Sequence, residues 1–552
     1  MTGPAQRPAT RATAVALGLI VAAGLGVRLW GITFALPHVL ARPDELFLIG
    51  IVITRLHAGD PNPRMFDYPG VYLYIVAGIF AIYQAWGLLT GRFSGAAPLQ
   101  DAFRTAWEPF FLMVRAVNAV LGAATAALCY AIAAPLLGRV AALCSSLFMA
   151  LAFLHVRDSH YATTDIPMAF FICCAMLAVV RLHRSRLGSD ARLAGIFGGL
   201  AVGTKYNAVL LAAPMLAVEL IHAWPHRGDW RRALRETWIF QMALISAAVF
   251  FATSPYLVLD HQTALQHLGE LQASTSAGMT PSEMLGRGWT YHLPVSLRHG
   301  LGLPLLIASL GGLVWMGIRQ PSLALILGSF PIAYYLVAGA GHNVFVRYMI
   351  PVVPFMCIFA GYAVSEMAAA AARMTRLPHA AVAATLAILV VAPSAVSVAR
   401  FDWLLAQEDS RLVAARWIHE HVPAGSSIYM SGNIYGHPQL EPPDRKYRLF
   451  GFDRRAGTFT VRERIDGRPT ERHAGAQPDV IVVQKSAIPF SHIPAPVEAM
   501  LDSQYNLVHV VVAANLSAEG NVYDIQDGFY APFAGFKGVR RPGPNLEIYQ
   551  RR

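Results

Sequence analysis

The chain has 552 residues, of which 55% are hydrophobic and only 14% are charged. Because an average globular domain carries roughly 25% charged residues, this composition excludes a soluble globular enzyme, a disordered chain and a coiled coil. The mean hydropathy of +0.44 instead indicates a polytopic membrane protein. The net charge of +11 comes from basic residues between apolar segments, as the positive-inside rule requires, so it does not indicate nucleic acid binding.

The predicted elements begin with an apolar helix over residues 14–35, preceded by Arg7 and Arg11. No convincing cleavage site follows it, so we expect a retained first helix and not a signal peptide. Residues 194–220 are too many for one spanning helix and are interrupted at Lys205, which predicts two shorter helices joined by a turn. Further runs long enough to span a bilayer begin near Phe111, Ala141, Ile166, Trp238, Leu301, Ser322, Tyr348 and Ala380.

The apolar segment 71–89 decides the predicted topology. If it crossed the membrane, the arginine-rich connections at 181–186, 227–235 and 373–376 would face outward, against the positive-inside rule. We therefore expect it to lie along the outer interface, where its tyrosine and tryptophan side chains prefer headgroup depth. This gives about eleven spanning helices, a cytoplasmic N-terminus and an external C-terminus. External loops are expected at 36–110 and 256–300, within a membrane domain of residues 1–399.

The composition changes near residue 400, and residues 400–552 are expected to form a small extracytoplasmic α/β domain. The segment starting at Asp409 is typical of an amphipathic helix, with Leu412, Trp417 and Ile418 near one face. Residues 426–430 and 480–483 are typical of short strands. We recognise no catalytic constellation in this domain, which favours a lid or an acceptor-binding module.

Ionisable residues gather in loops that share the outer side of this topology. Such groups are costly at membrane depth and by default mark a function. No HxxxH or HExxH pattern pairs the histidines and all five cysteines lie in apolar runs, so no metal site is expected. The candidate residues are Asp44, Glu45, Asp67, Tyr68, Asp158, His160, Asp165, Lys205, Arg347 and Tyr348.

These residue types suit transfer from a lipid phosphate. Arg347 and Lys205, the only lysine of the hydrophobic part, are suited to hold a phosphate as a bidentate fork and a point charge. Asp44 is suited to take a proton from an incoming hydroxyl or amine, and Asp165 to orient the acceptor or the sugar. We find no P-loop and no dinucleotide motif, and a lipid-phosphate leaving group needs neither.

Each candidate also has a structural interpretation. Asp44 and Glu45 follow Pro43 and are typical of a helix start, and Asp165 is typical of a helix N-cap. Lys205 can be a snorkelling helix end and Arg347 an interfacial anchor. Asp158 can pair with its neighbour Arg157. The histidines, His160 among them, are typical structural hydrogen-bonding groups.

Several motifs occur in a fixed order: Arg42-Pro43-Asp44-Glu45, Asp67-Tyr68-Pro69, Thr-Thr-Asp165-Ile-Pro, Gly-Thr-Lys205-Tyr and Arg347-Tyr-Met-Ile-Pro. Together they resemble the GT-C superfamily of integral-membrane glycosyltransferases, in the branch of protein O-mannosyltransferases and aminoarabinose transferases, over approximately residues 10–400. Aminoarabinose transferases carry Glu-Lys-Pro in place of Asp67-Tyr68-Pro69, so an aminoarabinose donor is not implied. The chain also lacks the extra luminal domain of eukaryotic protein mannosyltransferases, so a protein acceptor is not implied.

The resemblance implies an inverting, metal-independent or metal-optional transfer on the extracytoplasmic face of a bacterial inner membrane. No cofactor is required, and a divalent cation is optional. Asp44 corresponds to the family's base, Asp165 to its second-loop aspartate, with Asp158 as the alternative, and Lys205 and Arg347 to its lipid-phosphate ligands. The expected partners are a polyprenyl-phosphate sugar donor, membrane lipids and an acceptor that is a glycan, a lipid or a protein. The alternative function is a polytopic transporter or lipid flippase, for which carboxylates are expected at helix centres.

Overall fold

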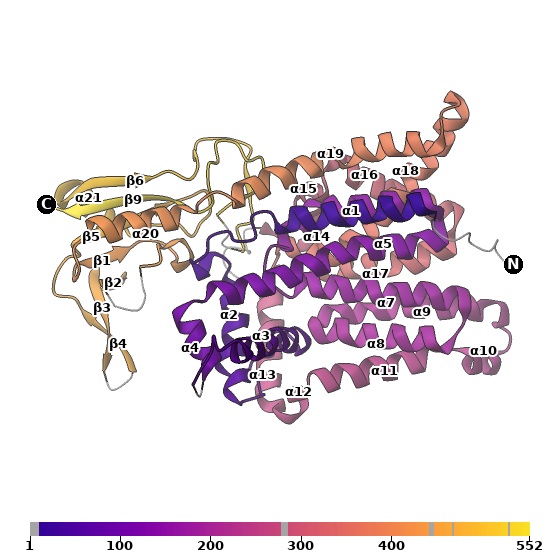
Figure 1. Cartoon of the computed structure of the whole chain (residues 1–552), viewed down its shortest axis with the longest axis horizontal. Helices are drawn as coiled ribbons and strands as arrows, with labels where there is room; N and C mark the ends of the chain where they lie inside the picture. Colours follow the sequence, from indigo (N-terminus) through magenta and orange to yellow (C-terminus); the bar gives the residue numbers. More distant parts are fainter. Residues whose placement is uncertain (1–9, 96, 278–284, 441–445, 466–467, 528–529) are drawn as a thin grey trace. The chain divides into compact units, whose positions relative to one another are not determined.

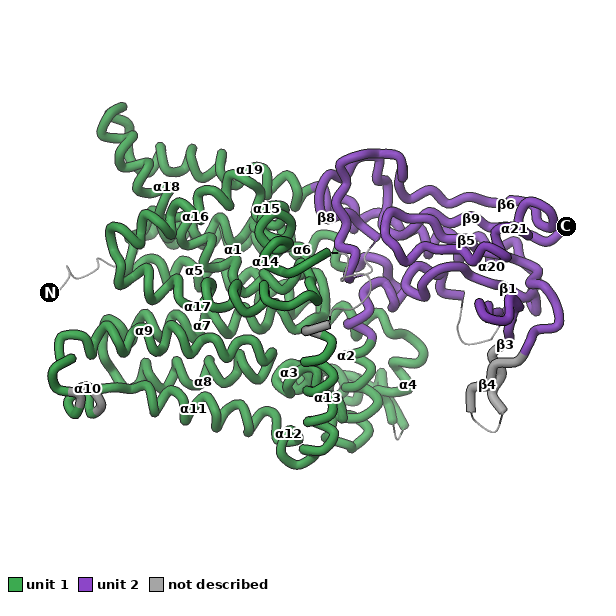
Figure 2. The backbone as a smooth tube through the Cα atoms, turned by 180° about the vertical axis from the view of Figure 1, so that it is seen from behind, with its two compact units in different colours: residues 1–32, 47–399 green, residues 33–46, 400–552 purple. Residues whose placement is uncertain are grey.

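The computed structural model describes residues 10–552 except residue 96 and the segments 278–284, 441–445, 466–467 and 528–529. The chain divides into two compact units (Figure 2), residues 1–32 with 47–399, and residues 33–46 with 400–552. The division at residue 400 coincides with the change in composition. Residues 33–46, expected in the membrane domain, belong instead to the second unit.

The first unit consists of long helices, most of them apolar, together with short helical segments and turns. The long helices are α1 Arg11–Leu29, α3 Val71–Leu89, α5 Glu108–Leu151, α7 Asp165–Ser185, α8 Gly188–Thr204, α9 Ala212–Ala223, α11 Ile239–Thr253, α13 His261–Ala277, α16 Leu303–Arg319, α17 Pro321–Ala340, α18 Val353–Thr375 and α19 His379–Leu405. The short segments are α2 Pro43–Thr54, α4 Pro98–Thr105, α6 Phe153–Asp158, η3 Tyr206–Leu211, α10 Trp230–Glu236, α12 Tyr256–Leu259, α14 Gly288–Tyr291, η6 His292–Leu297, α15 Arg298–Leu301 and η7 Val346–Val352.

Within the described residues, eight helices are long and apolar enough to cross a membrane, or nine if the bent pair α14–α15 and α16 is one span. This confirms a polytopic helical membrane protein, while the predicted number of about eleven stays a prediction. The count includes α3, but Figure 1 shows α3 nearly end-on where α7, α8 and α11 run across the view. A crosswise apolar helix is consistent with an interfacial position.

Helix α18 forms the centre of the first unit and packs against α5 and α16. Its residues from Val353 to Val364 are all buried.

Helix α5 contains a break at Gly138, whose φ of +85° is not helical, so its 44 residues form two helical halves. This agrees with the two separate apolar runs predicted to begin near Phe111 and Ala141. A second break separates α8 from η3 at Lys205, as predicted.

The second unit is a mixed α/β domain, as expected. Its sheet has the strand order β4-β3-β2-β1-β5-β9-β6, and β1 runs parallel to both β2 and β5. The strands are β1 Ser427–Met430, β2 Arg448–Asp453, β3 Thr458–Ile465, β4 Arg468–His473, β5 Val480–Lys485, β6 Tyr505–Val511 and β9 Asn545–Arg551, with β7 Val522–Tyr523 and β8 Pro532–Ala534 forming a separate pair. The helices are α20 Ser410–His421 and α21 Ala495–Gln504, and short turns lie at η1 Val39–Ala41 and η8 Ile434–Gly436.

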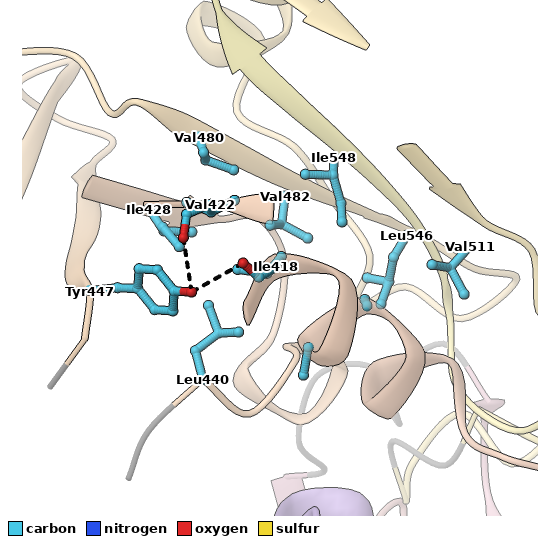
Figure 3. Packing of buried hydrophobic residues seen from close by; sticks show 12 residues of the cluster. Ile418, Val422, Ile428, Leu440, Tyr447, Val480, Val482, Val511, Leu546 and Ile548 are labelled. Atoms are coloured by element: carbon cyan, nitrogen blue, oxygen red, sulfur yellow. Dashed lines mark hydrogen bonds between the residues drawn. The ribbon is translucent and has the colours of Figure 1, made fainter. Parts of the chain in front are cut away.

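The period-two alternation of β5 explains why the sheet is covered on both faces. Val480 and Val482 belong to one buried cluster, with Ile418 of α20. Ile481 and Val483 belong to the other, with Leu501 of α21. Figure 3 shows the α20 side, where the Tyr447 hydroxyl lies 3.1 Å from the Ile418 carbonyl oxygen and 3.4 Å from that of Val422.

Candidate active site

Asp165 and Lys205 form a buried ion pair at the ends of two helices. The Lys205 ammonium donates a hydrogen bond of 2.7 Å to Asp165 Oδ1, and their side chains are 9% and 2% exposed. Asp165 is the first residue of α7, and Lys205 is the C-cap of α8 with an extended backbone. Helix ends favour a carboxylate at the N-terminus and a cation at the C-terminus, so both charges suit the local backbone.

The N-cap interpretation of Asp165 is wrong, because the N-cap residue is Thr164. The Asp165 carboxylate contacts Lys205 instead of capping a backbone N–H. The snorkelling interpretation of Lys205 is also not supported, since its ammonium is buried against a carboxylate and does not extend to solvent.

Arg347 adds a second cation to the same carboxylate. Its Nε lies 3.9 Å from Asp165 Oδ2, and its side chain is 6% exposed. The turn η7 carries it, and the guanidinium carbon lies 4.5 Å from the ring centre of Phe345, a stacking geometry that suits arginine. One carboxylate therefore lies between two cations, and the three side chains together carry a net positive charge.

Two tyrosines flank the Lys205 ammonium, which lies 5.7 Å from the ring centre of Tyr68 and 5.2 Å from that of Tyr348. Both distances are within the range of cation–π attraction. Tyr68 comes from the loop before α3, and this loop is held at both ends. The Tyr206 hydroxyl donates to the Phe66 carbonyl at 2.9 Å, and the Gly70 N–H donates to Ser254 Oγ at 2.9 Å.

Glycine is required at position 70 because of close packing. A Cβ at Gly70 would overlap the carbonyl oxygen of Thr253. Close packing and a hydrogen bond therefore join the Asp67-Tyr68-Pro69-Gly70 motif to the Ser254-Pro255 motif. This contact holds the loop that places Tyr68 near the ammonium of Lys205.

Asp67 does not join this group. Its carboxylate Oδ1 lies 3.9 Å from His267 Nδ1 on α13, and its side chain is 43% exposed. Partial burial raises the pKa of this carboxyl, and the nearby Glu270 raises it further while His267 opposes both. A role for Asp67 in substrate binding stays a prediction.

Asp158 and His160 make structural contacts in a fully buried turn. Asp158 pairs with Arg157 at 3.3 Å, as its structural interpretation predicted. The two ring nitrogens of His160 lie 2.9 Å from the Val156 carbonyl oxygen and 3.0 Å from that of Trp30. These contacts account for the burial of both residues, and their roles in substrate binding stay predictions.

Asp44 and Glu45 lie in the first turn of α2, directly after Pro43, which is the ordinary helix start that the sequence suggested. Glu45 is fully buried and Asp44 is partly exposed. Both belong to segment 33–46 of the second unit, whereas Asp165, Lys205 and Arg347 belong to the first. The convergence of Asp44, Asp165, Lys205 and Arg347 on one cavity stays a prediction.

Sequence reasoning missed the partners that hold segment 33–46. Arg42 pairs with Asp527 at 2.9 Å, with both side chains almost completely buried. His38 Nε2 lies 2.8 Å from the His437 carbonyl oxygen, and the Val39 N–H donates to Gln439 Oε1 at 3.1 Å. No local pattern signals these contacts, because each joins residues far apart in the chain.

Among the described residues, no three His, Cys, Asp or Glu side chains gather closely enough to hold a metal ion. The dependence of any activity on a divalent cation stays an expectation to be tested with chelators.

Residues 91–261 match the family model described as dolichyl-phosphate-mannose-protein mannosyltransferase. This range includes Asp165 and Lys205. No curated protein sequence matches the chain.

Two solved structures are similar over most of this chain. ArnT from Cupriavidus metallidurans, described as bound to undecaprenyl phosphate, has a TM-score of 0.53 at 16% identity, covering 97% of this chain and 97% of that one. The archaeal oligosaccharyltransferase AglB from Archaeoglobus fulgidus, described with an inhibitory peptide and a dolichol-phosphate, has a TM-score of 0.51 at 13% identity. That match covers 77% of this chain, which spans only 63% of the AglB chain.

At these identities the structural matches establish the fold. The matched family model is one of glycosyltransferases, the enzyme class expected from the sequence, and the two neighbours are described as ArnT and an archaeal oligosaccharyltransferase. The resemblance that the sequence motifs indicated is thereby confirmed at the level of the fold: the chain has the fold of the GT-C glycosyltransferases.

Proposed function

We propose that the protein transfers a sugar from a polyprenyl-phosphate donor to an acceptor on the extracytoplasmic side of the membrane, with inversion at the anomeric carbon. The observation that carries this proposal is the group formed by Asp165, Lys205 and Arg347. The described complexes of ArnT with undecaprenyl phosphate and of AglB with a dolichol-phosphate support a lipid-phosphate donor.

The charge of this group suits a phosphate leaving group. As the bond between the anomeric carbon and the phosphate oxygen breaks, the phosphate keeps the electron pair and its negative charge grows. Lys205 and Arg347 are held in place before the reaction, so they stabilise that charge without reorganising. Asp165, the residue that the sequence suggested for the acceptor or sugar, is better assigned to orienting the two cations, since its two oxygens face them.

Asp44 is the proposed general base. A hydroxyl or amine of the acceptor attacks the anomeric carbon, forming the new glycosidic bond, and its proton passes to the Asp44 carboxylate. A single base is sufficient for inversion, whereas a retaining mechanism needs a carboxylate nucleophile in addition.

The second unit has a corresponding proposed role, which is to hold the segment that carries Asp44. The contacts that attach this segment include the Arg42–Asp527 ion pair and the hydrogen bonds of His38 and Val39. Asp44 is two residues from Arg42, so a fixed Arg42 restricts where the carboxylate can lie. This role is more specific than the lid or acceptor module expected from the sequence.

A transporter would place its charged groups differently. Alternating access requires the coupling residues near the membrane midplane, whereas Asp165 begins α7 and Lys205 ends α8. The position of the ion pair at helix ends therefore favours the transferase.

The experiment measures how much labelled sugar the purified full chain transfers from radiolabelled polyprenyl-phosphate sugars to a cell-envelope extract. We expect a labelled product from the wild type and its loss in Arg347→Gln. Arg373→Gln, which removes an exposed arginine at the far end of α18, is the matched control and should keep wild-type transfer. Equal transfer by wild type and Arg347→Gln would contradict the proposed phosphate site.

A further inference from the structure

A cavity of about 830 Å³ lies between α5 and α7, and neither Asp165, Lys205 nor Arg347 lines it. This volume is in the range of pockets that hold small-molecule ligands. The two helices pack side by side (Figure 1), and the cavity occurs where α5 is interrupted. Nothing in the proposed glycosyl transfer uses it.

The sequence of α5 explains the opening. Pro135 removes a backbone N–H donor and crowds the preceding turn, which bends a helix. Three residues later Gly138 has φ +85°, so the helical path stops and restarts at Arg139. A Cβ at Gly138 would meet no atom within 4 Å, so the backbone there borders open space.

The cavity has an apolar side and a basic side. Ala131, Ala134, Leu177 and Val180 supply apolar walls, and Arg139, Arg181 and Arg184 supply positive charge. Asp190 is the acidic residue of the lining. Its Oδ1 lies 3.1 Å from Arg181 Nε, and its Oδ2 accepts a hydrogen bond of 2.6 Å from Ser185. Three arginines against one aspartate leave the lining with a net charge of two positive units.

The cavity lies at the opposite end of α7 from the ion-pair group. Asp165 is the first residue of α7 and Arg184 is in its last turn. At 1.5 Å per residue this separation is about 30 Å, which matches the thickness of a bilayer's hydrocarbon core. If Asp165 lies near one membrane boundary, the arginines lie near the other, at the depth of lipid headgroups.

We propose that this cavity binds an anionic glycerophospholipid of the surrounding bilayer, with its phosphate against Arg139 and Arg184 and an acyl chain along the apolar wall. Arginine matches phosphate oxygens bidentately, and the charge of the lining complements an anionic headgroup better than a zwitterionic one. The alanines beside Pro135 leave room for the chain. The proposal does not depend on glycosyl transfer.

Native mass spectrometry of the full chain in detergent tests the proposal, using phosphatidylglycerol and phosphatidylcholine with the same acyl chains. Two basic groups near a membrane surface are expected to favour the anionic lipid by about ten-fold or more. The double variant Arg139→Gln/Arg184→Gln should abolish this preference while still binding phosphatidylcholine. Arg181 is left unchanged, because its loss would remove a partner from the buried Asp190 carboxylate.

The matched control is Arg373→Gln/Arg376→Gln. It removes two exposed arginines from the end of α18. Because α18, like α7, begins close to the residues of the ion-pair group, its last turn is comparable in position to the last turn of α7. The control should keep the lipid preference. If the double variant does not fold, the single change Arg184→Gln, at an exposed position, should by itself lower the preference for phosphatidylglycerol over phosphatidylcholine.

The proposal would be overturned by equal binding of the two lipids to the wild type, by an unchanged preference in the cavity variants, or by an equal loss in the control. A competition experiment distinguishes a bound lipid from a soluble phosphate. Glycerol 3-phosphate should not displace bound phosphatidylglycerol, because it lacks the acyl chains, and full displacement would overturn the assignment to a lipid.

Discussion

At the residue scale, one carboxylate is shared by two cations. Asp165 contacts Lys205 at 2.7 Å and lies 3.9 Å from Arg347. Burying such charges costs desolvation energy, so a buried ion pair is weak evidence for stability by itself. The proposed phosphate site gives this group a role that stability alone does not, because three separate segments bring two oriented cations to one carboxylate.

Lys205→Met is expected to lower sugar transfer by about 10²-fold or more, the size of effect seen when a preorganised donor to a developing oxyanion is removed. Lys205→Arg should recover part of the rate, because it restores the charge with a different shape. The matched control is Lys485→Met, which removes a half-exposed lysine of β5. Transfer above half the wild-type rate in Lys205→Met would contradict a role for this ammonium.

At the element scale, segment 33–46 is held by the second unit through buried polar contacts. Breaking a buried ion pair by removing one partner costs about 3–5 kcal/mol, because the other charge stays buried. Asp527→Asn should therefore release the segment locally.

Hydrogen–deuterium exchange measures this release, with faster exchange expected for backbone amides of residues 38–46 in Asp527→Asn. Glu547→Gln removes a carboxylate from a pair with Lys485, whose own side chain is 51% exposed, and should leave the exchange of this segment unchanged. Unaltered protection in Asp527→Asn would show that the ion pair does not hold the segment.

Two buried histidines make the second unit sensitive to acid. Burial lowers the pKa of His38 and of His437 from 6.5 to about 4. The unfolded chain binds these protons below about pH 6.5, whereas the folded unit binds them only below about pH 4. Their contribution to stability is therefore complete above pH 6.5 and is lost as the pH falls to 4, by about 3 kcal/mol for each histidine.

Denaturant unfolding of residues 400–552 in the full chain, followed by pulse proteolysis at pH 7 and pH 5, tests this sensitivity. The variant His38→Gln/His437→Gln should lose less stability between the two pH values than the wild type. His421→Gln, at an exposed position, should follow the wild type. An identical pH dependence in the double variant would mean that other groups cause the loss.

At the scale of the whole molecule, the expected topology places the second unit outside and the α7–α8 connection inside. All five cysteines are buried, so a cysteine introduced at an exposed site can be labelled selectively. A membrane-impermeant maleimide should label Glu519→Cys in intact spheroplasts, and Leu187→Cys only after the membrane is opened. The reverse pattern would invert the topology and the proposed side of the reaction.

Local patterns predicted much of this fold, because helices and short strands depend on neighbouring residues. The helix after Asp409, the strands near 427 and 480 and the break at Lys205 all follow from periodicity and charge. The pairing of β5 with β9, the Asp165–Lys205 contact and the attachment of residues 33–46 to the second unit depend on distant partners. A single sequence gives no signal for such pairings.

The most direct test of the central claim is transfer of labelled sugar from a polyprenyl phosphate by the purified chain and by its Asp44→Asn variant, with donor binding measured in parallel. We predict that Asp44→Asn binds the lipid donor like the wild type and forms no labelled product, because the amide cannot accept the acceptor's proton. Wild-type turnover by Asp44→Asn would contradict the proposed mechanism.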